Sequence, residues 1–109
     1  MKSKLQVLKY KIEVDAHREG FYIVEVDMPK GANPISCGAQ PGYFTSRIET
    51  VSIWATAHQN VPVVLHRFGV LGTGVSEVTE EELAEGKFLG TVINGPAVWH
   101  IFDLGEKDG

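Results

Sequence analysis

Hydrophobic and polar residues alternate along most of this chain, which is typical of strands with one buried face. The first alternating run covers residues 8–14. The second covers residues 21–28 and is apolar on both faces at its start, because Phe21 and Ile23 add to the alternating set. Turn-forming and charged residues at 15–20 separate the two runs, so the pattern predicts a β-hairpin.

The rest of the pattern predicts five more strands joined by loops and tight turns. The predicted strands are 35–40, 49–57, 62–71, 88–93 and 97–104. The predicted loops and turns are 29–34, 41–42, 42–47 and 58–60, with 105–109 as a frayed tail. The last two strands form a predicted hairpin around Asn94-Gly95.

One segment, residues 79–86, has the signals of a short helix. Thr79 can cap its start, and Glu82 follows at the spacing of a capping box. Gly86 suits its end. A helix this short is stable only if it packs on the sheet, and Leu83 is the residue expected to do so.

About seven strands and one short α-helix (about 79–86) predict a mainly β fold. We expect an antiparallel β-sandwich or a small barrel-like meander. The chain of 109 residues has the usual size of one domain, so residues 1–109 are predicted to form a single β-rich domain. Its hydrophobic content of 43% is sufficient for a folded core.

The charge of the chain limits its partners. The formal net charge is −4, and the 10 Lys and Arg residues are scattered. Duplex nucleic acid is bound by a concentrated cationic surface, so no duplex nucleic acid partner is expected. A small phosphorylated ligand needs only one or two arginines and stays compatible with this composition.

Cysteine content and hydropathy indicate the compartment. Cys37 is the only cysteine, so an intramolecular disulfide is excluded, and we interpret its side chain as a small buried hydrophobic group. The chain shows neither the apolar core of a signal peptide nor the roughly 20 apolar residues of a spanning helix. We expect a cytoplasmic protein with no membrane partner.

Gly72-Thr73-Gly74 follows a predicted strand and partly matches phosphate-binding motifs. A P-loop needs a longer glycine frame and a lysine. The dinucleotide fingerprint needs a third glycine where this chain has the acidic Glu77. Neither motif is complete, so no cofactor is expected. The segment is either a structural turn or a loop whose glycines let a ligand approach the backbone.

Two histidines are candidate metal ligands. His66 and His100 alternate with apolar residues, and if their strands pair, the imidazoles could share a face and bind a metal with Asp103 or Glu77. Asp103 is at an odd separation from His100 and faces the other way in a regular strand. We favour two partly buried histidines and no metal. No serine or cysteine has a base in motif context, so no catalytic residue is assigned and the protein is predicted not to be an enzyme.

Aromatic side chains beside arginines are the best candidates for ligand contacts. Tyr43 and Phe44 adjoin Arg47 in a predicted loop, where they cap the core, contact another subunit, or stack on a base. Arg67 lies in a strand and could share a face with the two tryptophans. The residues predicted to contact a ligand are Tyr43, Phe44, Arg47, Arg67, Gly72, Thr73 and Gly74.

Six sequence blocks carry a family resemblance: KYKIEV, MPKGA, SIWA, FGVLGTG, FLGTV and VWHIF. In this order and spacing they resemble a family of short proteins of bacteriophages and prophages, a domain of unknown function. The resemblance covers about residues 8–103, and the segment PISCGAQPGYFTSRIE is longer and more irregular than the family pattern. The resemblance implies a phage-type accessory protein in the host bacterial cytoplasm, and it supplies no catalytic residues.

These observations together predict a non-enzymatic protein that acts by binding. A homo-oligomer is expected, since a small monomer offers little concave surface. The expected ligand is either a host protein, which would be inhibited, or a small nucleotide signal of antiviral defence, which would be sequestered. The alternative is a structural or assembly-associated phage protein that makes contacts through its sheet edges and the 43–47 loop.

Overall fold

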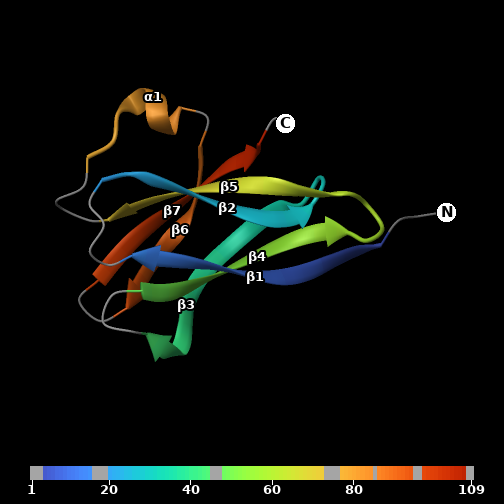
Figure 1. Ribbon diagram of the computed structural model, residues 1–109, viewed down its shortest axis with the longest axis horizontal. Helices are drawn as coiled ribbons and strands as arrows, with labels where there is room; N and C mark the ends of the chain where they lie inside the picture. Colours follow the sequence, from blue (N-terminus) through green and yellow to red (C-terminus); the bar gives the residue numbers. More distant parts are fainter. Residues whose placement is uncertain are drawn as a thin grey trace.

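The computed structural model describes residues 4–15, 20–44, 48–72, 77–84, 86–94 and 97–107. Within these ranges the chain forms seven strands and one short helix (Figure 1). In chain order they are β1 (Leu5–Asp15), β2 (Tyr22–Pro29), β3 (Asn33–Phe44), β4 (Ile48–His58), β5 (Val63–Gly72), α1 (Glu80–Leu83), β6 (Lys87–Asn94) and β7 (Ala97–Glu106). The predicted mainly β fold is confirmed.

The strands form two antiparallel sheets that face each other. The smaller sheet has the order β1-β4-β3, and the larger has the order β2-β5-β7-β6. Every ladder among the described residues is antiparallel, and no ladder joins the two sheets into a closed barrel. Of the two predicted architectures, the chain therefore adopts the sandwich.

The two predicted hairpins have different outcomes. β6 and β7 pair as neighbours around the predicted turn, with Asn94 opposite Ala97, so that hairpin is confirmed. The predicted hairpin of β1 and β2 is wrong, because β1 pairs with β4 along its whole length and β2 pairs with β5. Alternation shows that a strand has one apolar face, but it does not specify the partner strand.

β3 is longer than the sequence predicts. It continues through Pro41-Gly42, where a turn and a loop were predicted, and its pairing with β4 is irregular between Ala39 and Phe44. β3 is an edge strand, and an edge strand tolerates proline because one side of its backbone needs no ladder partner. The frayed tail was also predicted too early, since β7 includes Gly105 and Glu106.

The core lies between the sheets and is made of inward side chains from all seven strands. Its largest fully buried members include Phe68, Ile12, Met28, Ile53 and Ile101. Each such side chain contributes roughly 1.5–3 kcal/mol relative to its exposed state. Cys37 of β3 is half-buried and packs against this core, and its Sγ faces the Cα of Gly90 on β6 so closely that a Cβ at Gly90 would lie 2.9 Å away.

Candidate functional site

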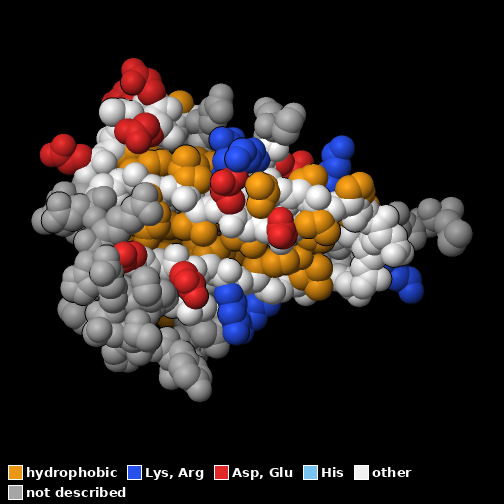
Figure 2. All heavy atoms as spheres, viewed as in Figure 1, with side chains coloured by type: hydrophobic (Ala, Val, Ile, Leu, Met, Phe, Trp, Pro, Cys, Tyr) orange, Lys and Arg blue, Asp and Glu red, His pale blue; other side chains and the backbone are white. Residues whose placement is uncertain are grey.

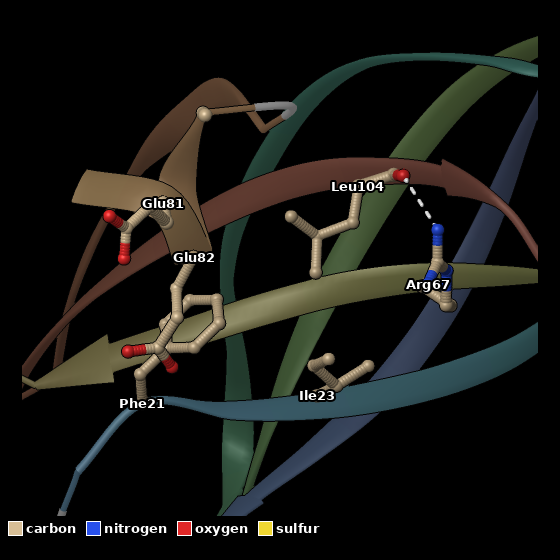
Figure 3. Close-up of a pocket in the computed structure, with 7 residues that line it drawn as sticks. Phe21, Ile23, Arg67, Glu81, Glu82 and Leu104 are labelled. Carbon is tan, nitrogen blue, oxygen red and sulfur yellow. Dashed lines mark hydrogen bonds between the residues drawn. The ribbon is translucent and has the colours of Figure 1, made fainter. Parts of the chain in front are cut away.

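A cleft of about 310 Å³ opens on the outer face of the larger sheet, beneath α1 (Figure 3). Its volume is at the lower end of the range for small-ligand sites. The cleft is lined by Phe21, Ile23, Arg67, Glu81, Glu82, Ala84 and Leu104. Phe21, Ile23 and Leu104 form an apolar floor. Arg67 lies at one end, and the two glutamates lie on the α1 side, as Figure 3 shows.

The floor depends on a glycine in the middle of β5. Phe21 and Ile23 share the outer face of the sheet, and Ile23 lies opposite Gly69. A Cβ built on Gly69 would be 2.4 Å from Cζ of Phe21, so the ring occupies the space that any other residue would fill. Glycine at this strand position therefore permits the close approach of the aromatic ring to the backbone.

The other side of the floor is formed by a β-bulge in β7. Arg67 lies opposite Gly105 and Phe68 lies opposite Asp103, so Leu104 is the extra residue of β7. Gly105 has a φ of +84°, a conformation that side chains other than glycine rarely adopt. Leu104 points outward into the cleft, while Asp103 faces the core beside Phe68.

Glu81 and Glu82 form an acidic wall of the cleft, and the predicted capping box, which is confirmed, holds this wall in place. The backbone N–H of Glu82 donates to Oγ1 of Thr79 at 3.1 Å, and the N–H of Thr79 donates to Oε1 of Glu82 at 3.0 Å. These bonds position the Glu82 side chain. The helix itself covers only Glu80–Leu83 and is shorter than the predicted 79–86.

The guanidinium of Arg67 has N–H groups that are not fully hydrogen-bonded within the described part of the protein. Its Nη2 donates to the carbonyl of Leu104 across a long 3.4 Å, and its Nε is buried with no hydrogen-bond partner among the described residues. An N–H donor without a partner carries a free-energy cost. The guanidinium of Arg67 can therefore donate hydrogen bonds to an anionic oxygen at the mouth of the cleft.

A buried polar pair lies behind this cleft, on the inner face of the same two strands. Nε2 of His66 is 2.6 Å from Oδ1 of Asp103, which also accepts the N–H of Gly105 at 2.9 Å. Burial alone would raise the pKa of Asp103, but the hydrogen bonds from His66 and Gly105 and the positive charges of His66 and Lys87 lower it overall. Asp103 is thus a carboxylate acceptor, and the proton of the pair resides on Nε2 of His66.

Of the residues predicted to contact a ligand, the structure places Arg67 in the cleft and separates it from the others. Tyr43 and Phe44 belong to β3 in the smaller sheet, not to a loop. Gly72 ends β5 opposite Trp99 and does not line the cleft. Arg47, Thr73 and Gly74 lie outside the described residues.

The two histidines considered as metal ligands do not share a face of the sheet. His66 is buried in the core with 3% exposure, whereas His100 lies opposite Leu71 on the outer face and contacts Oγ1 of Thr91 at 3.0 Å. Two imidazoles on opposite faces of one sheet cannot bind the same ion. Within the described part of the chain, no group of three potential ligands comes together.

The two tryptophans also lie apart from Arg67. Trp99 belongs to the core, and the ring of Trp54 packs on Gly38, whose Cβ would be 3.3 Å from Cζ3. Ser36, the Cα partner of Trp54, lies in the smaller sheet. The idea that both tryptophans share a face with Arg67 is therefore wrong.

The sequence prediction missed Phe21, Ile23 and Leu104 as cleft residues. The available signal was the apolar second face at the start of β2, together with a glycine inside a predicted strand. Alternation places Leu104 on the outer face of β7 with His100, but it does not show that this face meets β2 at a cleft.

The fold and the cleft define a small two-sheet β protein with a ligand-sized hollow on the outer face of its larger sheet. A family model described as "Domain of unknown function (DUF7352)" matches residues 3–108, and the chain belongs to this family. Membership in a family of unknown function was predicted. Comparisons with curated proteins and with solved structures gave no match. No helix in the described ranges has the length and hydropathy needed to cross a bilayer.

Proposed function

We propose that this protein acts by binding and that the cleft beneath α1 holds a small nucleotide-type ligand. The observation that carries the proposal is Arg67, whose guanidinium stands at one end of an apolar cleft with its Nε unpartnered. A phosphate oxygen supplies the acceptor that this group lacks. Phe21 and Ile23 offer the apolar surface on which a base can rest.

The acidic wall limits the ligand further. Carboxylates of Glu81 and Glu82 accept hydrogen bonds from amino and ring N–H groups of a base, while they repel additional phosphate. One arginine and two glutamates therefore suit a ligand with a single phosphate group or a cyclic phosphodiester better than a polyphosphate. This charge pattern supports a nucleotide signal over a nucleoside triphosphate.

The location of the polar groups supports binding without catalysis. His66 and Asp103 resemble a catalytic pair in composition, but their side chains are 3% and 14% exposed and face the core. A general base must reach its substrate directly or through one water molecule. We propose, with the resemblance described above, that the protein is a phage-type accessory factor that sequesters such a ligand in the bacterial cytoplasm.

A second candidate is the structural or assembly-associated role, in which the protein makes contacts through its sheet edges. The observation that favours it is the exposure of large apolar side chains near strand edges, where Leu5 and Val7 of β1 are 60% and 61% exposed. Inhibition of a host protein would use the same surfaces.

The test is calorimetric titration with cyclic mononucleotides, cyclic dinucleotides and ADP-ribose derivatives. We expect one of them to bind, and the Arg67→Ala variant to bind it about 10–100-fold more weakly, since a hydrogen bond to a charged group contributes about 1.5–3 kcal/mol. Lys30→Ala is the matched control, because it removes an exposed cation outside the cleft. Unchanged affinity in Arg67→Ala, or no binding by the wild type, would refute the proposal.

A further inference from the structure

The two sides of the sandwich differ in how they are closed. On one side β3 and β6 are in close contact, with Cys37 packed on Gly90. On the other side β1 and β2 touch at few points, and no ladder joins them. Figure 1 shows these two strands at the front of the molecule, running in opposite directions. Both are edge strands, so each has one edge without a ladder partner. At one end of these edges the backbone N–H of Asp15 in β1 donates to the hydroxyl of Tyr22 in β2 at 3.1 Å.

Apolar side chains are accessible along this open side. Leu8 and Tyr10 of β1 and Val24 and Val26 of β2 are only partly buried against the core. Figure 2 shows hydrophobic side chains forming a belt along this side of the molecule. A free edge next to an apolar belt favours the addition of another strand.

Facing segments of the two outer faces carry opposite charges. Lys9 and Lys11 are exposed on β1, beside an exposed Glu13. Glu25 and Asp27 are exposed on β2, where Glu25 also pairs with Lys107 at 3.2 Å. An antiparallel alignment that places Lys11 opposite Glu25 also places Lys9 opposite Asp27. Opposite charges at facing positions stabilise a pair of strands.

The same alignment matches the inner faces. With Lys11 opposite Glu25, Ile12 faces Val24 and Tyr10 faces Val26. Within one chain the two strands belong to opposite layers and pair with β4 and β5, so no ladder joins their complementary edges.

We propose that a second copy of this chain covers the open side, with β1 of each copy paired to β2 of the other. A two-fold axis parallel to the strands makes both new pairs antiparallel. The smaller sheet of one copy then continues into the larger sheet of the other, and the apolar belts of both copies are buried.

Pairing of two β2 strands is disfavoured by the same charges, because it would bring Glu25 and Asp27 near their own copies. Pairing of two β1 strands can place Lys11 opposite the exposed Glu13, but it would leave β2 of both copies uncovered. The reciprocal β1–β2 arrangement is the one that covers both edges.

The experiment is a reciprocal charge exchange followed by light scattering after size-exclusion chromatography. One variant carries Lys9→Glu and Lys11→Glu, and the other carries Glu25→Lys and Asp27→Lys. We expect the wild type to have the mass of two chains, and each variant alone to have the mass of one, with at least tenfold weaker self-association. An equimolar mixture regains the mass of two chains, because both new interfaces then join opposite charges.

A matched control carries Lys30→Glu and Lys87→Glu, which reverses two exposed lysines outside β1 and β2 and should leave the wild-type mass unchanged. Circular dichroism checks that each variant is folded. If a variant fails to fold, deuterium exchange of the wild type decides: protection of β1 and β2 amides must increase with protein concentration. A monomeric wild type, a mixture that stays monomeric, or protection independent of concentration would overturn the proposal. If β1 and β2 of one chain instead close the open side by themselves, the wild type will have the mass of one chain, and the proposal is overturned.

Discussion

His66 and Asp103 are joined on the inner face of the larger sheet, with 2.6 Å between Nε2 and Oδ1. Their Cα positions are not directly opposite, because Asp103 pairs with Phe68 and His66 pairs with Glu106. Oδ1 of Asp103 also accepts the N–H of Gly105, so the pair is tied to the bulge of β7. Leu104, which lines the cleft, lies between these two residues of the bulge.

The Asp103 carboxylate makes stability depend on acid pH. Its pKa is lowered in the folded protein, so its contribution is present above the unfolded value of about 4 and is lost as the pH falls through the folded pKa. We expect Asp103→Asn to lower the free energy of unfolding by about 1–3 kcal/mol at pH 7. Urea denaturation at several pH values should show this difference shrinking below pH ~4. Parallel pH profiles of the two proteins would contradict the assignment.

Gly105 tests the bulge itself. Its φ of +84° is in the left-handed region, and no neighbouring atom lies within 4 Å of a Cβ placed there. Gly105→Ala should therefore destabilise the protein by about 1–2 kcal/mol through backbone strain alone. Gly105→Asn is the matched comparison and should cost less, because asparagine tolerates this conformation better. Equal stability of glycine and alanine, measured by urea denaturation, would show that the left-handed geometry is not required.

The strands of this fold could be predicted from the sequence because each has one apolar face. The capping box of Thr79 and Glu82 could be predicted because its hydrogen bonds are local. The pairing of β1 could not be predicted, because alternation does not specify the partner strand. The path of β3 through Pro41 could not be predicted either, because the local residues favour a turn, whereas β3 pairs with β4 on both sides of this segment, at Ala39 and at Phe44.

The cleft was predicted only at Arg67. Its other members come from three segments distant in sequence, and their meeting depends on topology. Leu104 shares the outer face of β7 with His100 by regular alternation, but its place beside Phe21 and Ile23 depends on the strand order β2-β5-β7. His66 and Asp103 were both noticed, but His66 was grouped with His100, and the sheet separates those two.

Gly69 is expected to control the shape of the cleft floor. A methyl group at this position would lie 2.4 Å from Cζ of Phe21, so Gly69→Ala must displace the ring. We expect a loss of about 1–3 kcal/mol in the free energy of unfolding, the usual range for overpacking. Gly38→Ala is the control, because its Cβ would be 3.3 Å from the Trp54 ring and outside the cleft. A ligand of the cleft should bind more weakly to Gly69→Ala than to Gly38→Ala, and equal affinities would contradict the role of Phe21.

Cys37 is expected to react slowly with thiol reagents in the folded protein. Burial raises the pKa of its thiol, and the reactive species is the thiolate, so less of it is present at neutral pH than in the unfolded chain. The rate of modification, followed with a chromogenic disulfide at pH 7, should increase when urea unfolds the protein.

Gly90→Ala places a methyl group 2.9 Å from Sγ and should loosen the contact between β3 and β6, which makes Cys37 react faster in the folded state. Gly31→Ala, a strained substitution in the turn before β3 with no atom within 4 Å of the new Cβ, separates general destabilisation from this local effect. If Gly31→Ala accelerates the reaction as much as Gly90→Ala at matched stability, the protection of Cys37 reflects global unfolding and not its packing on Gly90.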